Sequence, residues 1–203
     1  MKRQSVLVSV SILFGVTGLC RADLYQWSVA SGGSGHFYEP VLVPAGIDWE
    51  GANDAAIDRG GYLATVTSAA ENTFVYGLVD DSVFWRPTGP DNGEGPFLGG
   101  YKEPATSDPA ANWHWVTGEP WDYTNWVEIE PSGPELQNRL HFFGYYRRMG
   151  SLWNDVWNVN YLENGYVVEF NQDPSIVPLP GAALLGVLGL GYGGWRLRRY
   201  DLL

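Results

Sequence analysis

The sequence predicts a single α+β domain between two apolar ends, and three observations support this. Helical patterns occur only in the first half of the chain, at 48–61 and 67–79. From residue 83 onward the pattern changes to short aromatic segments separated by Gly, Pro and Asn, which is typical of strands. Within that part, residues 117–138 show no regular pattern. Two early helices followed by an antiparallel sheet define an α+β architecture.

Each predicted helix has a recognisable start. Asp48 can cap the first helix, and Ser68 and Glu71 have the spacing of a capping box at the start of the second. A pair of glycines at 60 and 61 ends the first helix. The inward faces are formed by Trp49, Ala52 and Ala56 in the first helix and by Phe74, Val75 and Leu78 in the second.

The predicted strands are short and rich in aromatic and β-branched residues. HFYEPVLV precedes the first helix and YLATV follows it, and the later strands are FLGGY, WHWV, RLHFF, SLWND and GYVVEF. The irregular stretch at 117–138 is long for a connection inside a compact domain. Loops of that length are usually functional.

The first 22 residues predict a secretory signal peptide. Two basic residues precede an apolar run from Val6 to Leu19, and Ala22 stands at the expected cleavage position. Cys20 does not indicate a lipoprotein anchor, because Leu19 occupies a place where such a site needs a small residue. We therefore expect an exported domain over residues 23–170.

The last segment, 178–203, joins a Pro-Leu-Pro turn to a Gly-rich apolar stretch from Ala182 to Trp195, followed by three arginines. This layout resembles the bacterial PEP-CTERM sorting tail in its Val-Pro-Leu-Pro variant, a signal for an exosortase-type processing enzyme. A plain membrane anchor is the alternative, although the stretch is shorter than the ~20 apolar residues of a stable span. Residues 171–177 are predicted to be a linker.

Without its two ends the chain is strongly acidic and has no cysteine. The ends contain six of the 12 basic residues but one of the 23 acidic ones, so the domain carries a charge of about −16. Such a surface repels nucleic acid and anionic lipid and attracts divalent cations. We exclude nucleic acid as a partner and expect membrane contact through the tail alone. Because Cys20 is the only cysteine, disulfides cannot hold the domain.

From His36 to Phe170 the order of elements resembles the C-type lectin-like domain. The matching segments are IDWEGANDAAIDRGGYLATVTSAAENTFV, FLGGY, WHWVTGEPWDYTNW, and WND followed by GYVVEF. The resemblance implies two helices packed on short antiparallel sheets with a long irregular loop. It also implies that Ala56 and Val168 stand near the positions of a disulfide that is usual in the family.

In sugar-binding members of that family, calcium is held at the long loop by a Glu-Pro-Asn motif, a later Glu, and an Asn-Asp pair after a tryptophan. The corresponding residues here are Glu130, Ser132, Gln137, Asn154 and Asp155, and the family pattern implies a cis bond before Pro131. The earlier Glu119 precedes YTNW, so we assign it to the first turn of the loop.

These residue types suit Ca²⁺, which takes six to eight oxygen ligands. Glu130 and Asp155 supply charge, and the other three supply neutral oxygens. Ser132 is shorter than Asn and Gln137 lacks the charge of Glu, so we expect weak binding, roughly 10⁻⁴ to 10⁻³ M. Glu135 could replace Gln137 in a shifted register.

A sugar would also contact Glu130 and Asn154 directly, through hydroxyls that donate to the first and accept from the second. Trp121 and Trp157 lie beside the predicted site, where they either stack on a ligand or cover the loop. His36, His114 and His141 show no metal-ligand spacing, and we interpret all three as structural.

The sequence therefore predicts an exported, non-enzymatic carbohydrate-binding domain that acts at the cell surface or in the exopolysaccharide matrix, with weak calcium dependence. A calcium-independent module that binds a surface protein through the same loop is the alternative. No motif marks a catalytic carboxylate pair, so we do not expect an enzyme.

Overall fold

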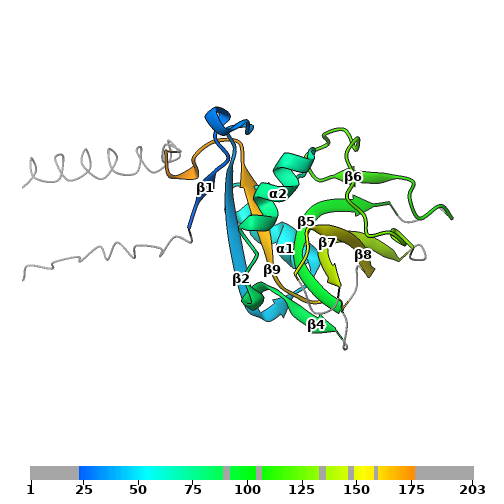
Figure 1. Cartoon of the computed structure of the whole chain (residues 1–203). Coiled ribbons are helices and arrows are strands. Elements are labelled where there is room, and N and C mark those ends of the chain that lie inside the picture. The colour runs from blue at the N-terminus through cyan, green and yellow to red at the C-terminus, as the bar shows by residue number, and fades with distance from the viewer. Residues whose placement is uncertain are drawn as a thin grey trace, which may run out of the picture.

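The structure, a computed structural model, describes residues 23–88, 92–103, 107–132, 136–145, 149–157 and 160–176. The predicted signal peptide, the sorting tail and residue 177 of the linker lie outside the described residues. Figure 1 shows strands β1, β2 and β9 on one side of the domain and β5 to β8 on the other.

The described chain contains two α-helices, α1 (Trp49–Asp58) and α2 (Ala69–Gly77). Three 3₁₀ turns accompany them: η1 (Val29–Ser31), η2 (Ser82–Phe84) and η3 (Pro174–Ile176). The strands are β1 (Tyr25–Gln26), β2 (Phe37–Ile47), β3 (Tyr62–Leu63), β4 (Arg86–Thr88), β5 (Asn92–Lys102), β6 (Trp113–Trp115), β7 (Gln137–Tyr145), β8 (Leu152–Trp157) and β9 (Glu163–Phe170).

The predicted α+β class is confirmed, and the strands join into one connected sheet. Its order is β1-β2-β9-β5-β7-β8, with β3 on β9 and with β4 and β6 on β5. All ladders are antiparallel except the contact of β5 with β9, where Phe97 pairs with Tyr166 in parallel. Strands β2 and β5 are each 11 residues long, so they exceed the short strands that the sequence predicts.

Both predicted helix starts are found. Asp48 accepts a hydrogen bond from Gly51 N at 2.8 Å, and Ser68 Oγ accepts from Glu71 N at 3.2 Å. The capping box is incomplete, because Glu71 accepts from the backbone N–H of Thr67 rather than from that of Ser68. The buried Glu71 carboxylate thereby fixes the residue that precedes the cap.

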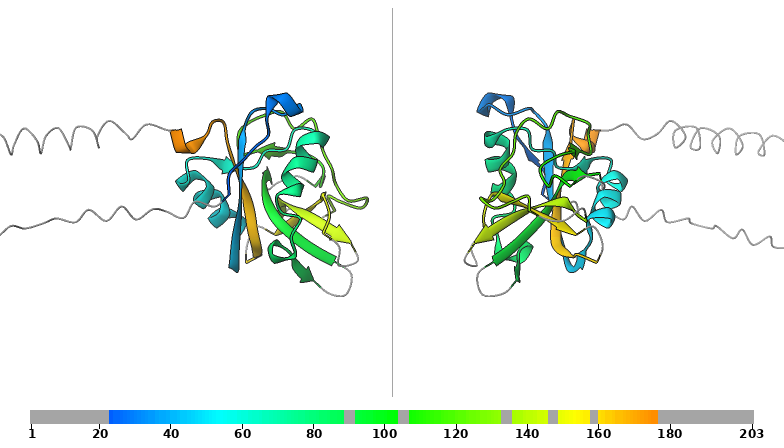
Figure 2. Two further views of the ribbon diagram at one scale, coloured as in Figure 1. Left: turned by 60° about the vertical axis from the view of Figure 1, so that its left-hand side comes forward. Right: turned by 90° about the vertical axis from the view of Figure 1, so that its right-hand side faces the viewer.

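The two helices lie on opposite sides of strands β2 and β9, as the two views of Figure 2 show. Helix α1 buries Trp49, Ala52 and Ala56 in one apolar cluster. Ala56 and Val168 are both fully buried in that cluster, so apolar contact occupies the region where the resemblance places a disulfide. A domain of this size buries ~70% of its unfolded surface, which is enough to fold without cross-links.

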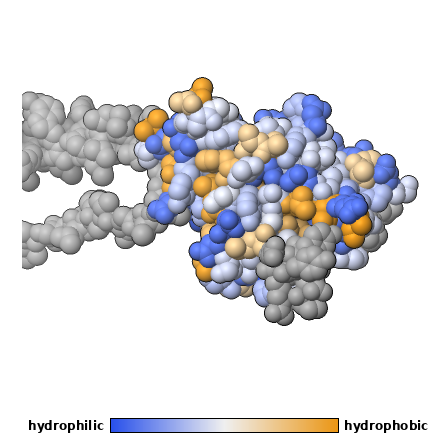
Figure 3. All heavy atoms as spheres, viewed as in Figure 1, coloured by the Kyte–Doolittle hydropathy of each residue, from blue (hydrophilic) through white to orange (hydrophobic). Residues whose placement is uncertain are grey.

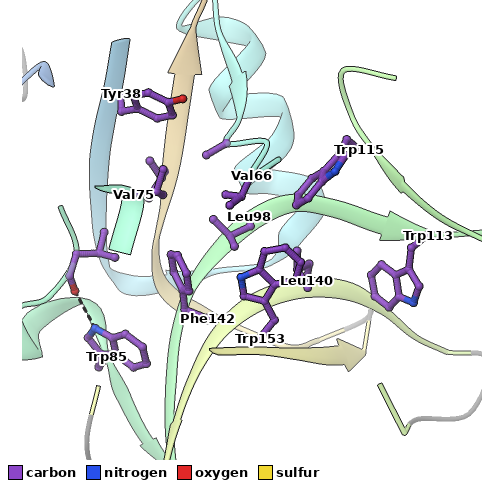
Figure 4. Close-up of a cluster of buried hydrophobic side chains, with 13 residues drawn as sticks. Tyr38, Val66, Val75, Trp85, Leu98, Trp113, Trp115, Leu140, Phe142 and Trp153 are labelled. Carbon is purple, nitrogen blue, oxygen red and sulfur yellow. Dashed lines mark hydrogen bonds between the residues drawn. The ribbon is translucent and has the colours of Figure 1, made fainter. Parts of the chain in front are cut away.

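The second apolar cluster lies between α2 and strands β5, β7 and β8, and Figure 4 shows its side chains. It joins aliphatic residues such as Val75 and Leu140 to four buried tryptophans: Trp85, Trp113, Trp115 and Trp153. The indole N–H of Trp85 donates to Val79 O at 2.8 Å, so this polar group is satisfied inside the core. The long loop packs against this cluster.

On the face drawn in Figure 3, hydrophilic side chains alternate with several separate apolar patches. Within the described part of the chain, no helix is long and apolar enough to cross a membrane.

Candidate functional site

The long loop after β6 is seated on tryptophans. The Trp121 ring lies 4.4 Å from Trp115 and 5.6 Å from Trp113 between ring centroids, and Trp126 lies 4.9 Å from Trp113. Ring pairs of this kind contribute ~0.5–1.5 kcal/mol beyond the burial of their area. Trp121 is half-buried and packs the start of the loop against the core. Its contact with a ligand stays a prediction.

Backbone hydrogen bonds fix the loop beside β8. Trp153 N donates to Asn125 O at 2.9 Å, and Val127 N donates to Trp153 O at 3.0 Å. A turn follows, in which Glu130 N donates to Val127 O at 2.9 Å. Since Asn154 comes directly after Trp153, the two predicted parts of the site are brought to the same end of the loop.

The conformation of Glu130 is fixed by the turn in which it lies. The Glu130–Pro131 peptide bond is cis, as the family pattern implies. The carboxylate of Glu130 accepts a hydrogen bond from Ser132 N at 2.6 Å, so Glu130 and Ser132 form one unit. Glu119 instead accepts from Thr117 Oγ1 at 3.0 Å and closes the first turn of the loop, where we assigned it.

Asn154 is held by a buried histidine. Asn154 Nδ2 lies 3.1 Å from His141 Nε2, and His141 Nδ1 lies 2.9 Å from Glu163 Oε1. Because an amide nitrogen can only donate, Nε2 accepts, and the proton of the neutral imidazole is on Nδ1, which donates to Glu163. The chain of bonds leaves the second N–H and the carbonyl oxygen of Asn154 for other partners.

Burial controls the charges of this chain. Burial lowers the pKa of His141 to about 4. The negative charges of Glu94 and Glu130 favour the imidazolium and so oppose this decrease. Burial also raises the pKa of Glu163 well above its usual value, and the charge of Glu94 adds to that rise. At neutral pH the histidine is therefore uncharged.

The five predicted calcium ligands do not all lie on one face. Asn154 pairs with His141 across the β7–β8 ladder, whereas Asp155 pairs with Leu140, so strand alternation sends their side chains to opposite faces. The Asp155 side chain is fully buried. Gln137 pairs with Trp157, three residues along β8 from Asn154, or ~10 Å at the strand rise. Glu130 and Ser132 therefore share one turn, Asn154 lies on the other face of β8 from Asp155, and the five-residue calcium set stays a prediction.

Apolar side chains surround the outer part of the loop. Trp157 is 42% exposed, and Ile129 and Leu136 are 70% and 51% exposed. All three belong to the loop or to the end of the β7–β8 ladder. Trp157 thus has the accessibility that a stacking residue requires, while Trp121 is enclosed by other rings.

His141, which the sequence analysis interprets as structural, is buried and joins Glu163 to Asn154. Sequence reasoning did not single out Glu163, because only the fold brings residues of β7, β8 and β9 together. It also did not single out Asn138, which is buried, with no hydrogen-bond partner for either amide atom among the described residues. The available sequence signal for Asn138 was its position, a polar residue directly before the apolar strand segment RLHFF.

The donor set suits a weakly held, oxygen-preferring cation. Among the described residues, no three His, Cys, Asp or Glu side chains are close enough together to hold a metal ion. Glu130, Ser132 and Asn154 would offer one carboxylate, a hydroxyl and an amide oxygen. Ca²⁺ accepts such neutral oxygen ligands, and its affinity falls as ligand charge falls. These residues therefore fit calcium, at low affinity.

No protein-family model matches the chain, and no curated protein matches it. Solved structures do. Herring type II antifreeze protein is 17% identical with a TM-score of 0.51, over 66% of this chain and 90% of that chain. The carbohydrate-recognition domain of the mouse scavenger receptor C-type lectin is 19% identical with a TM-score of 0.50, over 70% and 92%. The C-type lectin domain of murine dendritic cell inhibitory receptor 2, solved with an N-glycan, is 19% identical with a TM-score of 0.50, over 66% and 90%. The chain has the C-type lectin-like fold.

Proposed function

We propose that the protein is an exported carbohydrate-binding module whose long loop holds a saccharide with the help of a weakly bound calcium ion. One observation supports this above the others. Asn154 of β8 bonds to the buried His141, and the charge of Glu130 in the loop acts to raise the pKa of that histidine.

The residues of the loop have complementary roles in this proposal. The Glu130 carboxylate accepts a hydrogen bond from a sugar hydroxyl, and the second N–H of Asn154 donates to a neighbouring hydroxyl oxygen. His141 fixes the amide of Asn154, and Ser132 N fixes the carboxylate of Glu130. A calcium ion held by Glu130, Ser132 and Asn154 would supply positive charge for the hydroxyl oxygens. The exposed ring of Trp157 would pack against an apolar sugar face.

The choice of ligand class also draws on the similar structures. The domain of dendritic cell inhibitory receptor 2 was solved with an N-glycan, and that of the scavenger receptor C-type lectin is named a carbohydrate-recognition domain. This is an analogy at the level of the fold, so the site residues must carry the test. We assign binding rather than catalysis to the protein.

The ends of the chain define where it would act. We propose that the segment 1–22 directs export and that 178–203 is recognised by an exosortase-type enzyme, so that the domain acts at the cell surface or in the exopolysaccharide matrix. Mass spectrometry of protein from the native host tests this. Mature material that retains Trp195 and Arg199 would indicate a permanent anchor instead.

A second candidate function rests on the apolar surroundings of the loop. Ile129, Leu136 and Trp157 are all exposed there, and exposed apolar side chains at a loop mark contacts with proteins as well as with sugars. The alternative is a calcium-independent adhesion module that binds a surface protein through this loop.

Calcium calorimetry on the full chain separates the two functions. Wild type should show heat with a midpoint near 10⁻⁴ to 10⁻³ M, and Glu130→Gln should weaken it at least about tenfold, because it removes the anionic ligand that the loop supplies. Glu128→Gln is the matched control, since it removes an exposed carboxylate two residues away. A glycan array with and without chelator completes the test.

The outcomes are distinct. Glycan binding that chelator removes, together with a selective loss in Glu130→Gln, supports the proposed function. A folded wild type with no calcium heat at several times ~10⁻³ M excludes the metal. If the array is also negative, adhesion through the loop becomes the better explanation, and Trp157→Ala is then the first variant to measure.

A further inference from the structure

A second candidate site is formed by two cavities that share Tyr62 as a lining residue, one of them beside α1. One has a volume of about 380 Å³, and its lining includes Trp49, Asn53, Tyr101 and Arg139. The other has a volume of about 400 Å³ and is lined by His36, Thr117, Glu119 and Asn171. Tyr62 lines both, and both volumes fall within the ~300–1,000 Å³ of ligand sites.

Tyr62 is held as a rigid wall between the cavities. Its hydroxyl donates to Asn171 Oδ1 at 2.7 Å, and its backbone pairs with Glu169 of β9. The preceding Gly61 permits this close pairing, because a Cβ there would lie 2.5 Å from Glu169 O. The ring is half-buried, so it offers a fixed aromatic surface at little cost in conformational entropy.

The charges of the lining exclude an acidic ligand. Arg139 donates to Glu50 Oε1 from both Nε and Nη2, at 3.0 and 2.7 Å, and its guanidinium lies over the Trp49 ring. His36 Nδ1 lies 2.6 Å from the Glu169 carboxylate. Each cationic or potentially cationic side chain of the lining therefore has a carboxylate partner. Glu119 adds an exposed negative charge, so phosphate or uronate groups would be repelled.

The polar groups of the lining match a polyhydroxylated ligand. Asn53 supplies an amide to one cavity, and Thr117, Glu119 and Asn171 supply a hydroxyl, a carboxylate and an amide to the other. Both donors and acceptors therefore lie beside the Tyr62 ring. Thr117 Oγ1 donates to Glu119 and Asn171 Oδ1 accepts from Tyr62, so a ligand would meet the Asn171 amide nitrogen and the second Glu119 oxygen. Sugar rings combine hydroxyls that pair with such groups and apolar faces that pack on tyrosine.

We propose that this groove is a second saccharide site, which takes a neutral oligosaccharide of at least two rings, one in each cavity, without calcium. The site is separate from the predicted calcium site, because its lining contains none of the predicted calcium ligands. Its failure and the failure of the loop site can therefore be told apart.

The test uses the full chain on an array of neutral gluco-, manno- and galacto-oligosaccharides of two to six units, in excess EDTA. We expect EDTA-resistant binding that Tyr62→Ala weakens at least about tenfold, because the ring surface is lost. Tyr62→Phe keeps the ring and should retain most of the affinity. Tyr25→Ala is the matched control, since it removes an exposed tyrosine of β1 that lines neither cavity.

Asn53→Arg tests the groove without touching Tyr62. It places a longer side chain in the first cavity from the surface of α1, so a folded variant should bind the oligosaccharide at least about fivefold more weakly. Glu130→Gln should leave the EDTA-resistant binding unchanged. Absence of any EDTA-resistant binding overturns the proposal. So does binding that survives both Asn53→Arg and Tyr62→Ala in folded protein.

Discussion

Strand β9 carries two buried glutamates, and each is paired with a histidine, yet the two pairs are built differently. Glu169 accepts from Tyr38 Oη at 3.1 Å and from Thr65 N at 2.9 Å, besides its 2.6 Å contact with His36. Glu163 contacts His141 at 2.9 Å, and its Oε2 atom has no hydrogen-bond partner among the described residues.

The two histidines differ in access to water. The side chain of His36 is 29% exposed, whereas His141 is fully buried. A satisfied pair at the surface can exchange its partner for water, but a sealed pair cannot. The sealed pair is also the one that holds Asn154 of the proposed loop site. The comparison teaches that the cost of breaking a buried pair depends on what can replace the lost partner.

The largest effect is expected from His141→Ala. It opens a cavity and leaves both Glu163 Oε1 and Asn154 Nδ2 without their partner, so the free energy of unfolding should fall by roughly 4 kcal/mol. Urea unfolding measures this. His114→Ala is the control, because His114 is exposed and should change stability by less than ~0.5 kcal/mol. Equal stability of the two variants would show that the inner pair contributes nothing.

The second largest effect is a dependence of the unfolding free energy on pH, which is caused by Glu169. Burial raises its pKa to about 7, while hydrogen bonds from His36 and Thr65 oppose the rise and the charge of Glu71 adds to it. The folded state therefore retains a proton that the unfolded state releases near pH 4.5. Stability should be fully present below pH 4.5 and fall as the pH rises to about 7, by roughly 3 kcal/mol.

Glu169→Gln isolates this dependence, because the amide keeps the shape and cannot ionise. The difference in unfolding free energy between wild type and Glu169→Gln should change steadily from pH 4.5 to pH 8, in favour of the variant at high pH. Denaturant titrations at several pH values measure it. Parallel stability curves for the two proteins would contradict the raised pKa.

The smallest effect is expected from His36→Ala. Glu169 keeps Tyr38 Oη and Thr65 N as partners, and water can replace the exposed imidazole, so the loss should be about 1 kcal/mol. Thermal unfolding alongside His141→Ala makes the comparison direct. A loss as large as that of His141→Ala would mean that exposure does not distinguish the two pairs.

Much of the fold follows from local signals in the sequence. Asp48 and Ser68 predict the helix starts, because a side-chain oxygen at such a position can accept a hydrogen bond from the N–H three residues later. Trp49, Ala52 and Ala56 identify the buried face of α1 because helical periodicity places them together. The sequence also located the long loop, since residues 117–138 lack any period.

The site was predictable only in part. Glu130, Ser132 and Asn154 were named from their motifs, and the structure joins Glu130 to Ser132 and Asn154 to His141. Strand alternation then separated Asp155 from Asn154, because both lie within the regular part of β8. A motif gives the order of its residues but not the faces on which they lie.

By itself, the sequence determined the class of the fold, the helix caps, the absence of disulfides and the acidic charge, because each depends on composition or on residues close in the chain. The tertiary structure alone decided that His141 joins Asn154 to Glu163 and that Tyr62 separates two cavities. Those contacts join β3, β7, β8 and β9 with residues distant in sequence. Their pairing follows from the packing of the whole sheet, which no local pattern records.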